Sequence, residues 1–145
     1  MNIGEILIYL NPLLVICSIY FGFNYLKNND KADKRNFERL LFATLVTHTL
    51  ALLLLAYYFF KTDLRFEYVS DYSAENLSLG YKLAGVWAGR DGTLLLWAWA
   101  TILSINLERR WYSEDDKLKQ ITTIVGCIIL LAFCIIQLFI NPFSL

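Results

Sequence analysis

Four long stretches of the chain carry no charged residue, and this feature constrains the fold more than any other. With 57% hydrophobic residues among 145 and a mean hydropathy of +0.47, the composition is that of an integral membrane protein. The third stretch, Gly92–Leu107, is short by itself, but together with the residues before it, residues 83–107 extend for roughly 37 Å at ~1.5 Å per residue, enough to cross a bilayer. The charge-free stretches are Ile6–Leu26, Leu40–Phe60, Gly92–Leu107 and Ile121–Leu145. We therefore expect an all-α integral membrane protein, a single domain 1–145 with transmembrane helices at about 4–26, 40–60, 84–107 and 120–141.

The Lys and Arg residues indicate how these four helices are oriented. Nine of the 13 lie in two short segments, one after the first helix and one after the third. Basic residues concentrate in short cytoplasmic loops, so both segments are expected in the cytoplasm. Both termini and a long loop, 61–91, are then expected on the outer face of a multi-pass protein of the cell membrane. The nine residues are Lys27, Lys31, Lys34, Arg35, Arg39, Arg109, Arg110, Lys117 and Lys119.

The long outer loop has two sequence textures. Residues 63–69 alternate between apolar and charged side chains, which predicts a short extended segment. From Ser73 onward, Leu77, Tyr81 and Ala84 recur at helical spacing, which predicts a short interfacial helix leading into the third transmembrane helix. An amphipathic surface helix without any ligand is an equally good interpretation.

The start of the third transmembrane helix combines small and charged residues. Gly85 and Gly89 form a small-xxx-small pair, with Gly92 one turn further, so another backbone or a flat ligand can approach closely. Arg90 and Asp91 have two interpretations. In the first, which is the favoured interpretation of such a pair taken alone, the two charges neutralise each other at the level of the lipid headgroups. In the second, Arg90 faces inward and binds an anion such as a propionate or a carboxylate of a partner.

Two tryptophans of this region differ in expected depth. Trp87 belongs at the outer membrane interface, where tryptophan is common. Trp97 falls near mid-depth, where its N–H needs a partner inside a helix bundle or on a ligand. Packing within the bundle is the favoured interpretation, and a ligand-facing role is the alternative.

Reactive and metal-ligating residues are sparse. The single histidine, His48, lies near the middle of the second helix. One histidine cannot supply bis-His haem ligation within one chain, so a neutral imidazole bonded to a neighbouring helix is favoured over a metal ligand. The sequence has no nucleophile–base pair, paired carboxylates, Walker loop or basic nucleic-acid patch, so neither catalysis by this chain alone nor nucleic-acid binding is expected.

A more specific signal lies in residues 68–97, which read YVSDYSAENLSLGYKLAGVWAGRDGTLLLW. This run resembles the N-terminal region of the CcmF/NrfE family, the membrane haem lyases of the system I cytochrome c maturation pathway. In that family an outer loop contains an aromatic residue followed by a basic one and then leads to a Trp. After it come an acidic residue, a Gly and a small residue in succession, and a Leu-rich run that ends in Trp. The C-terminal segment 141–144, Asn-Pro-Phe-Ser, also resembles the family's exit from its fourth helix. The matching positions are Tyr68, Val69, Ser73, Leu77, Tyr81, Lys82, Trp87, Asp91, Gly92, Thr93, Leu94, Leu95, Leu96 and Trp97.

The resemblance implies a role in haem hand-off, in which a membrane-tethered chaperone presents haem to the CxxCH thiols of an apocytochrome on the outer face. The chain would supply the N-terminal scaffold, either as a separate subunit or as a truncated form, and would not form the thioether itself. Implied partners are the C-terminal half of the haem lyase, the haem chaperone, apocytochrome c with its thiol-reducing factors, and membrane lipid. Haem is expected in the assembled complex and not on this chain alone.

The resemblance also implies the residues of the functional region, with one departure. Family members often have His before the acidic-Gly step, where this chain has Arg90, so a role resting on imidazole chemistry there is not expected. The family's haem-binding histidines lie in later segments, and His48 matches none of them. A structural anchor subunit of a respiratory or transport complex remains the alternative function. The haem- or partner-facing candidates are Trp87, Arg90, Asp91, Gly92 and Trp97, with Tyr81 and Lys82 as outer-loop contacts.

Overall fold

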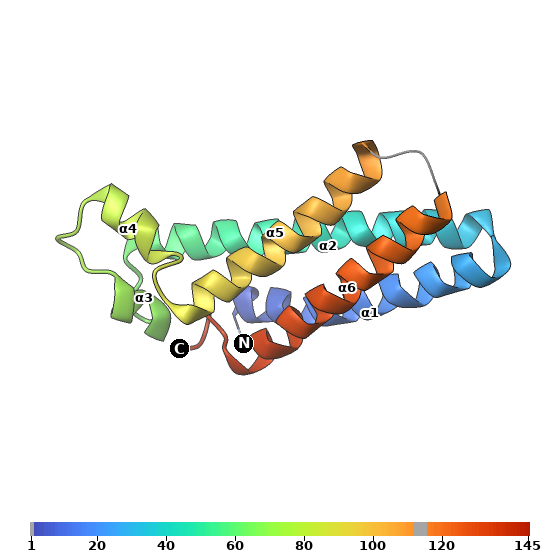
Figure 1. Cartoon of the computed structure of the whole chain (residues 1–145). Coiled ribbons are helices and arrows are strands. Elements are labelled where there is room, and N and C mark those ends of the chain that lie inside the picture. Colours follow the sequence, from blue (N-terminus) through green and yellow to red (C-terminus); the bar gives the residue numbers. More distant parts are fainter. Residues whose placement is uncertain (1, 112–115) are drawn as a thin grey trace.

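The computed structural model describes residues 2–111 and 116–145, and in these ranges all regular secondary structure is helical (Figure 1). The all-α prediction is therefore confirmed. Four of the helices are long, and two short helices lie between α2 and α5. The helices are α1 (Ile3–Asn28), α2 (Lys31–Lys61), α3 (Glu67–Tyr72), α4 (Leu79–Gly85), α5 (Arg90–Trp111) and α6 (Asp116–Phe139).

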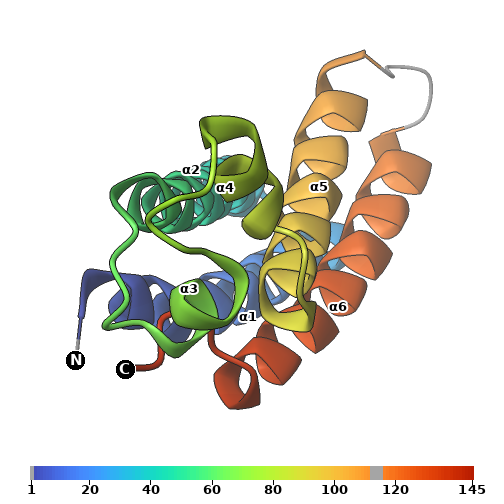
Figure 2. The ribbon, with the colours of Figure 1, turned by 90° about the vertical axis from the view of Figure 1, so that its left-hand side faces the viewer.

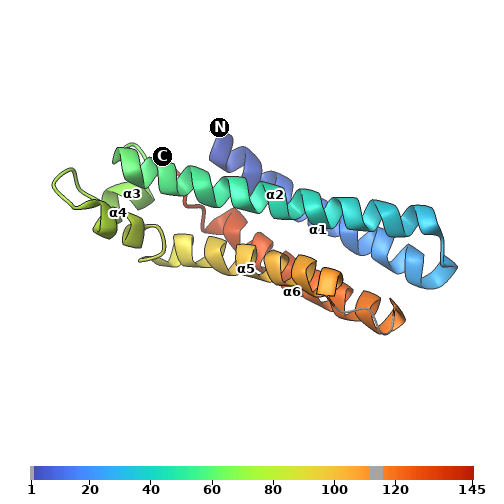
Figure 3. The same cartoon turned by 90° about the horizontal axis from the view of Figure 1, so that it is seen from above.

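The four long helices form one bundle. Helix α1 packs against α2 and α6, and α5 packs against the same two helices, so each long helix has two neighbours. Seen from above, α1 and α2 form one layer and α5 and α6 the other (Figure 3). Helices α3 and α4 lie together at one end of the bundle, near both termini (Figure 2). We call this the loop end, and the opposite end, where α1 turns into α2, the basic end.

The turn between α1 and α2 is much tighter than the sequence suggested. Asn29 ends α1 in the left-handed conformation, with φ of 53°, and its N–H donates to the Tyr25 carbonyl. Asp30 caps α2 by accepting a hydrogen bond of 2.9 Å from the Ala32 N–H. Helix α2 therefore begins at Lys31, well before the expected boundary at 40. Lys, Arg and Glu are good helix formers, and hydropathy marks only the part of a helix suited to hydrocarbon.

Among the residues that the structure describes, three helices, α1, α2 and α6, are long and apolar enough to cross a membrane. The fourth long helix, α5, has 22 residues but is not one of these three candidate spans. Its apolar run contains two tryptophans and several hydroxyl and amide side chains, which lower its hydropathy. The structure thus supports a membrane protein with three candidate spans, and the predicted fourth span rests on the length and packing of α5.

The interior of the bundle contains two apolar clusters. The cluster nearer the loop end includes Phe59, Leu95 and Phe143, and the cluster nearer the basic end includes Phe37 and Ile102. Between them along the helices lies a set of fully buried polar residues. These residues are Asn11, Thr44, His48 and Gln137. Asn11, His48 and Gln137 each contact a neighbouring helix, whereas Thr44 donates to a carbonyl oxygen within α2. These contacts offset part of the cost of burial, while Asn11 Nδ2 and Gln137 Oε1 have no hydrogen-bond partner among the described residues.

The loop end differs from the sequence prediction at residues 63–69. This segment turns and then enters α3 at Glu67, so the prediction of an extended segment was wrong. Tyr68 and Val69 are adjacent and both buried, whereas neighbouring side chains of a strand would point to opposite faces. The predicted short helix in this loop is present as α4. Its first helical residue is Leu79, later than the start suggested at Ser73.

Candidate functional site

Tyr68 organises the loop end through its buried hydroxyl group. The hydroxyl oxygen accepts a hydrogen bond of 3.0 Å from the Gly89 N–H. It also lies 3.2–3.3 Å from the carbonyl oxygens of Gly85, Val86 and Gly89, and its single proton can be donated to one of them at a time. Burial raises the pKa of Tyr68, which keeps the hydroxyl protonated and able to donate. One side chain of α3 thereby fixes the turn between α4 and α5.

Gly85 and Gly89 allow aromatic rings of the same chain to pack against this turn. A Cβ atom at Gly85 would lie 2.5 Å from a ring carbon of Phe59 and 2.8 Å from the Tyr72 carbonyl oxygen. A Cβ atom at Gly89 would lie 2.6 Å from the ring of Tyr72. All three distances are far below normal van der Waals contact of ~3.5–4.0 Å. The close approach predicted from the glycine spacing is real, and at these positions it is made within the chain.

Gly92 has the tightest surroundings of the three glycines. A Cβ atom there would collide with the Val86 carbonyl oxygen and would lie 2.6 Å from the Tyr68 hydroxyl oxygen. Because the first obstacle is backbone, no side-chain rotation could relieve it. Gly92 therefore lets the first turn of α5 pack under the turn that precedes it. Its contact with another subunit remains a prediction.

Arg90 and Asp91 form an ion pair at the start of α5. The Arg90 Nε lies 3.4 Å from an Asp91 carboxylate oxygen. The Arg90 side chain is 73% exposed, and that of Asp91 is 22% exposed. The structure thus shows the two side chains paired with each other, which was the favoured interpretation of the pair taken alone. Arg90 does not turn into the interior of this chain.

Arg90 and Asp91 also line a polar cleft of about 590 Å³ at the loop end. Its walls come from α3, the start of α5 and the end of α6. Three carboxylates and one guanidinium line it, so the cleft is acidic and suits a basic group better than an anion. The lining residues are Glu67, Tyr68, Asp71, Tyr72, Arg90, Asp91, Phe139, Ile140, Asn141 and Ser144.

The tryptophans of α5 lie on different faces. Trp97 is 60% exposed, and no described residue accepts a hydrogen bond from its indole N–H. The favoured expectation, that Trp97 packs within the bundle, does not hold for this chain. Trp99 instead faces the bundle, and its N–H donates to the Thr49 hydroxyl at 3.0 Å. Trp87 is 51% exposed near the turn, and its place at a membrane interface remains a prediction.

Trp97 borders an open groove between α5 and α6, with a volume of about 490 Å³. Small and hydroxyl-bearing residues such as Thr101 and Ser104 line it beside the branched apolar side chains of Ile105, Val125 and Ile129. Small and hydroxyl-bearing residues are typical of helix–helix contacts in membranes.

Tyr81 and Lys82, the two predicted loop contacts, have different environments. Tyr81 is 71% exposed on α4. The Lys82 ammonium group donates a hydrogen bond of 2.6 Å to the Thr62 hydroxyl at the end of α2. Lys82 therefore attaches α4 to α2, while Tyr81 is available to another molecule.

His48 is fully buried, and both of its ring nitrogens lie near polar partners. Nδ1 is 2.9 Å from the Thr44 carbonyl oxygen, and Nε2 is 3.7 Å from the Cys134 sulfur on α6. A neutral imidazole that donates from Nδ1 and accepts from the thiol satisfies both contacts. The structure thus shows the predicted hydrogen-bonded histidine. Within residues 2–111 and 116–145, no group of three or more His, Cys, Asp or Glu side chains could hold a metal ion.

The sequence analysis did not identify the roles of Trp99 and of the C-terminal tail. Trp99 could have been found, because it lies four residues after Leu95 on the buried side of α5, whereas Trp97 does not. The tail is fixed by Phe143, whose ring packs against Gly4 and whose carbonyl accepts a hydrogen bond of 2.8 Å from the Asn2 amide. No local sequence pattern predicts these contacts between the C-terminal tail and the N-terminus.

No protein-family model matches the chain, but individual relatives do. The cytochrome c-type biogenesis protein NrfE of Haemophilus influenzae is 33% identical over 104 residues, covering 70% of this chain and 16% of the relative. The probable NrfE of Escherichia coli is 35% identical over 104 residues, covering 64% of this chain and 18% of that protein. The chain thus spans about a sixth of the length of the curated relatives it matches.

The fold has a solved counterpart. A structure of the cytochrome c haem lyase CcmF superposes with a TM-score of 0.88, covering 97% of this chain and 24% of that one. At 20% sequence identity this likeness shows the fold, and the NrfE relatives supply the similarity in sequence. The chain therefore belongs to the CcmF/NrfE family of cytochrome c-type biogenesis proteins and corresponds to part of the length of its relatives.

Proposed function

We propose that this chain is the N-terminal subunit of a membrane haem lyase complex that matures c-type cytochromes. The observation that carries the proposal is the 33% identity to NrfE over 104 residues, which is supported by the CcmF-like fold. In this role the chain is a scaffold that positions haem delivery to apocytochrome on the outer face. It does not form the thioether bond itself.

We propose a topology of four membrane-spanning helices, with both termini and the loop end outside the cell membrane. The distribution of charge supports it, since the bundle brings the ends of α1 and α5 and the starts of α2 and α6 to the basic end (Figure 1). Helix α5 completes the bundle between α2 and α6 and is nearly as long as α6. Helices α3 and α4 then lie on the outer face, with α4 as the interfacial helix.

Haem in this proposal belongs to the assembled complex and is ligated by other parts of the lyase. Support comes from His48, whose two ring nitrogens already contact Thr44 and Cys134. The residues of this chain proposed to face haem or partners are those on its surface near the start of α5. Among them, Trp87, Arg90 and Tyr81 are exposed, and Gly92 acts by allowing this turn to pack.

The groove that Trp97 borders is the proposed contact with the C-terminal half of the lyase. An indole N–H without a partner is costly in hydrocarbon, and a neighbouring helix would supply an acceptor. The small side chain of Ala100 leaves room for close packing, whereas the space over Gly126 is already filled by Ile105 of α5. The acidic cleft at the loop end is the proposed contact for basic segments of the other partners, the haem chaperone, the apocytochrome and its thiol-reducing factors.

Site-specific photo-crosslinking in cells that produce c-type cytochromes tests this assignment. Benzoylphenylalanine would replace Trp97, and replacement of Leu13 is the matched control because both side chains are 60% exposed. We expect position 97 to crosslink to a haem-lyase polypeptide and position 13 to give lipid adducts only. A position-97 adduct with a respiratory or transport subunit would favour the structural-anchor alternative. Lipid adducts alone at both positions would contradict the proposed partner face.

A further inference from the structure

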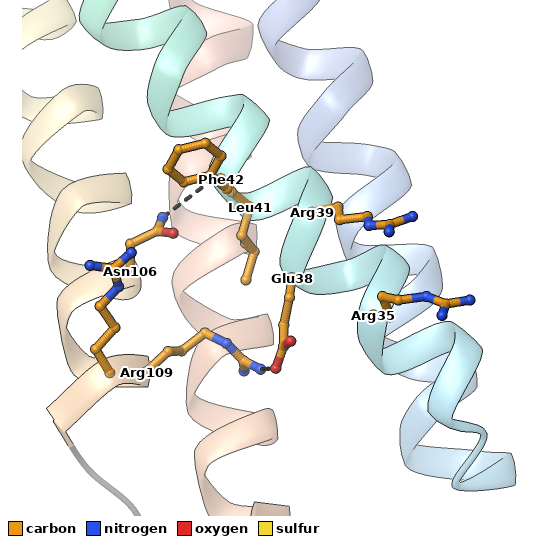
Figure 4. Close-up of a pocket in the computed structure, with 8 residues that line it drawn as sticks. Arg35, Glu38, Arg39, Leu41, Phe42, Asn106 and Arg109 are labelled. Atoms are coloured by element: carbon orange, nitrogen blue, oxygen red, sulfur yellow. Dashed lines mark hydrogen bonds and ion pairs between the residues drawn. The ribbon is translucent and has the colours of Figure 1, made fainter.

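A second groove lies at the basic end, between α2 and α5, and has a volume of about 530 Å³ (Figure 4). It lies at the far end of the bundle from the acidic cleft. Four arginines and one glutamate contribute to its walls, so its lining is strongly basic. The lining residues are Arg35, Glu38, Arg39, Leu41, Phe42, Asn106, Arg109 and Arg110.

Arg109 is a structural part of this groove. Its guanidinium lies 3.1 Å from a Glu38 carboxylate oxygen and also donates to Gln120 and Thr123 at 3.3 and 3.2 Å. It lies 5.1 Å from the centre of the Phe37 ring, and its side chain is only 10% exposed. Figure 4 shows Arg109 reaching Glu38 between the two helices. This pair is therefore satisfied and joins α2, α5 and α6.

The other three arginines have no such compensation. Arg35 and Arg39 on α2 and Arg110 on α5 are exposed, and no carboxylate in residues 2–111 and 116–145 pairs with them. Arg35 and Arg39 are four residues apart on one helix, where like charges repel. With Glu38 already paired to Arg109, no carboxylate of the described residues pairs with the other three positive charges of the groove. A bound anion would relieve this repulsion.

The groove also lies at a defined depth. Arg39 directly precedes the charge-free run 40–60 of α2, and Arg110 closely follows the charge-free run 92–107 of α5. The arginines therefore lie where a spanning bundle passes from hydrocarbon to water, whichever way the bundle is oriented. Leu41 and Phe42 line the same groove on the hydrocarbon side, and Phe42 is 56% exposed.

We propose that this groove binds the headgroup phosphate of an anionic phospholipid. The guanidinium groups of Arg39 and Arg110 bind phosphate oxygens through charge-assisted hydrogen bonds, for which arginine has the matching geometry. Arg35 adds a third charge, and an acyl chain packs on Phe42. Basic pockets between helices at a membrane surface are known to favour anionic headgroups in this way. The lipid would hold α2 and α5 together at their basic ends.

Lipid titration of the purified protein, monitored by native mass spectrometry, tests the proposal. The three probes are dioleoyl-phosphatidylglycerol, dioleoyl-phosphatidylcholine and inorganic phosphate. We compare the double variant Arg39→Gln/Arg110→Gln with Lys61→Gln/Arg65→Gln, which removes the same charge outside the groove. At about 1 kcal/mol per arginine near a membrane surface, we expect phosphatidylglycerol to bind about fivefold more weakly per arginine removed, or about 30-fold for the double variant.

The control variant should retain the phosphatidylglycerol affinity of the wild type. Phosphatidylcholine should bind more weakly than phosphatidylglycerol to the wild type and to the control variant, and this preference should shrink in the groove variant. Equal losses in both double variants would overturn the site, because only the net charge would then matter. Equal binding of inorganic phosphate and phosphatidylglycerol would overturn the assignment to a lipid. If the groove variant does not fold, Arg39→Lys/Arg110→Lys keeps the charges, and we expect it to retain preference for phosphatidylglycerol over phosphatidylcholine.

Discussion

Replacement of Gly92 by alanine tests whether close packing within the chain holds the start of α5. The added methyl group would collide with the Val86 carbonyl oxygen and would lie 2.6 Å from the Tyr68 hydroxyl and 2.9 Å from the Val86 carbonyl carbon. Atoms in contact normally lie ~3.5–4.0 Å apart, so the backbone at Val86 must move, and the Tyr68 hydroxyl must move with it by about 1 Å. The structure predicts that this movement disturbs the turn between α4 and α5.

The size of the effect follows from the contacts that must change. Overpacking a filled interior costs about 1–3 kcal/mol, and the upper part of that range applies because the obstacle is backbone. Displacement of the Tyr68 hydroxyl would weaken at least one hydrogen bond, at about 1 kcal/mol. Alanine recovers about 0.5–1 kcal/mol relative to glycine in a helix. We therefore expect Gly92→Ala to lower the free energy of unfolding by about 3 kcal/mol.

Gly80→Ala is the matched control, because no atom lies within 4 Å of a Cβ atom added at that helical position. This variant should be neutral or slightly stabilised. Both variants would be unfolded reversibly by dodecyl sulfate in mixed micelles, with helicity followed by circular dichroism at 222 nm. Equal stabilities for Gly92→Ala and Gly80→Ala would refute the packing described around Gly92.

Three other perturbations test separate parts of the structure. Tyr68→Phe should cost about 1–3 kcal/mol, because it removes the hydroxyl that binds the α4–α5 turn. Burial raises the pKa of Tyr68 in the folded state. The stabilisation given by the protonated hydroxyl group is therefore fully present below the unfolded-state pKa and is lost as pH rises through the folded-state pKa. In an alkaline titration followed at 295 nm, Tyr68→Phe should remove a late-ionising tyrosine, and an unchanged curve would count against this. Trp99→Phe should destabilise the isolated chain by about 1 kcal/mol through loss of the Thr49 hydrogen bond, whereas Trp97→Phe should have little effect in the same dodecyl sulfate unfolding assay. Arg90→Ala should reduce cytochrome maturation, measured by haem staining, while membrane-fraction immunoblots show normal insertion. Unchanged maturation would remove Arg90 from the candidate site.

The sequence identified the long helices because each charge-free run reports where a helix can lie in hydrocarbon. It could not locate their ends, since Lys31 and the residues after it continue α2 beyond the apolar region. The extended segment predicted at 63–69 was wrong for a related reason. Alternation there reflected a turn followed by α3, and burial of both Tyr68 and Val69 depends on contacts with distant helices.

The candidate site could be located in the sequence but not resolved in detail. The Arg90–Asp91 pair is adjacent in the chain, so mutual neutralisation was predictable from the sequence. The neighbours of Gly92 were not predictable, because they depend on how α3 folds back on the turn before α5. Trp97 and Trp99 are two residues apart and so point to different sides of a helix. Their roles could be separated only by following the buried stripe that includes Leu95 and Ile102.

The central proposal is that this chain serves in the attachment of haem to c-type cytochromes. Haem-peroxidase staining of membrane c-type cytochromes in a strain lacking the chain measures this directly, with plasmid complementation to exclude effects on neighbouring genes. We predict that the stained bands disappear in the deletion strain and return with the plasmid. Undiminished staining in the deletion strain would contradict an essential role in this pathway and would favour a structural-anchor subunit.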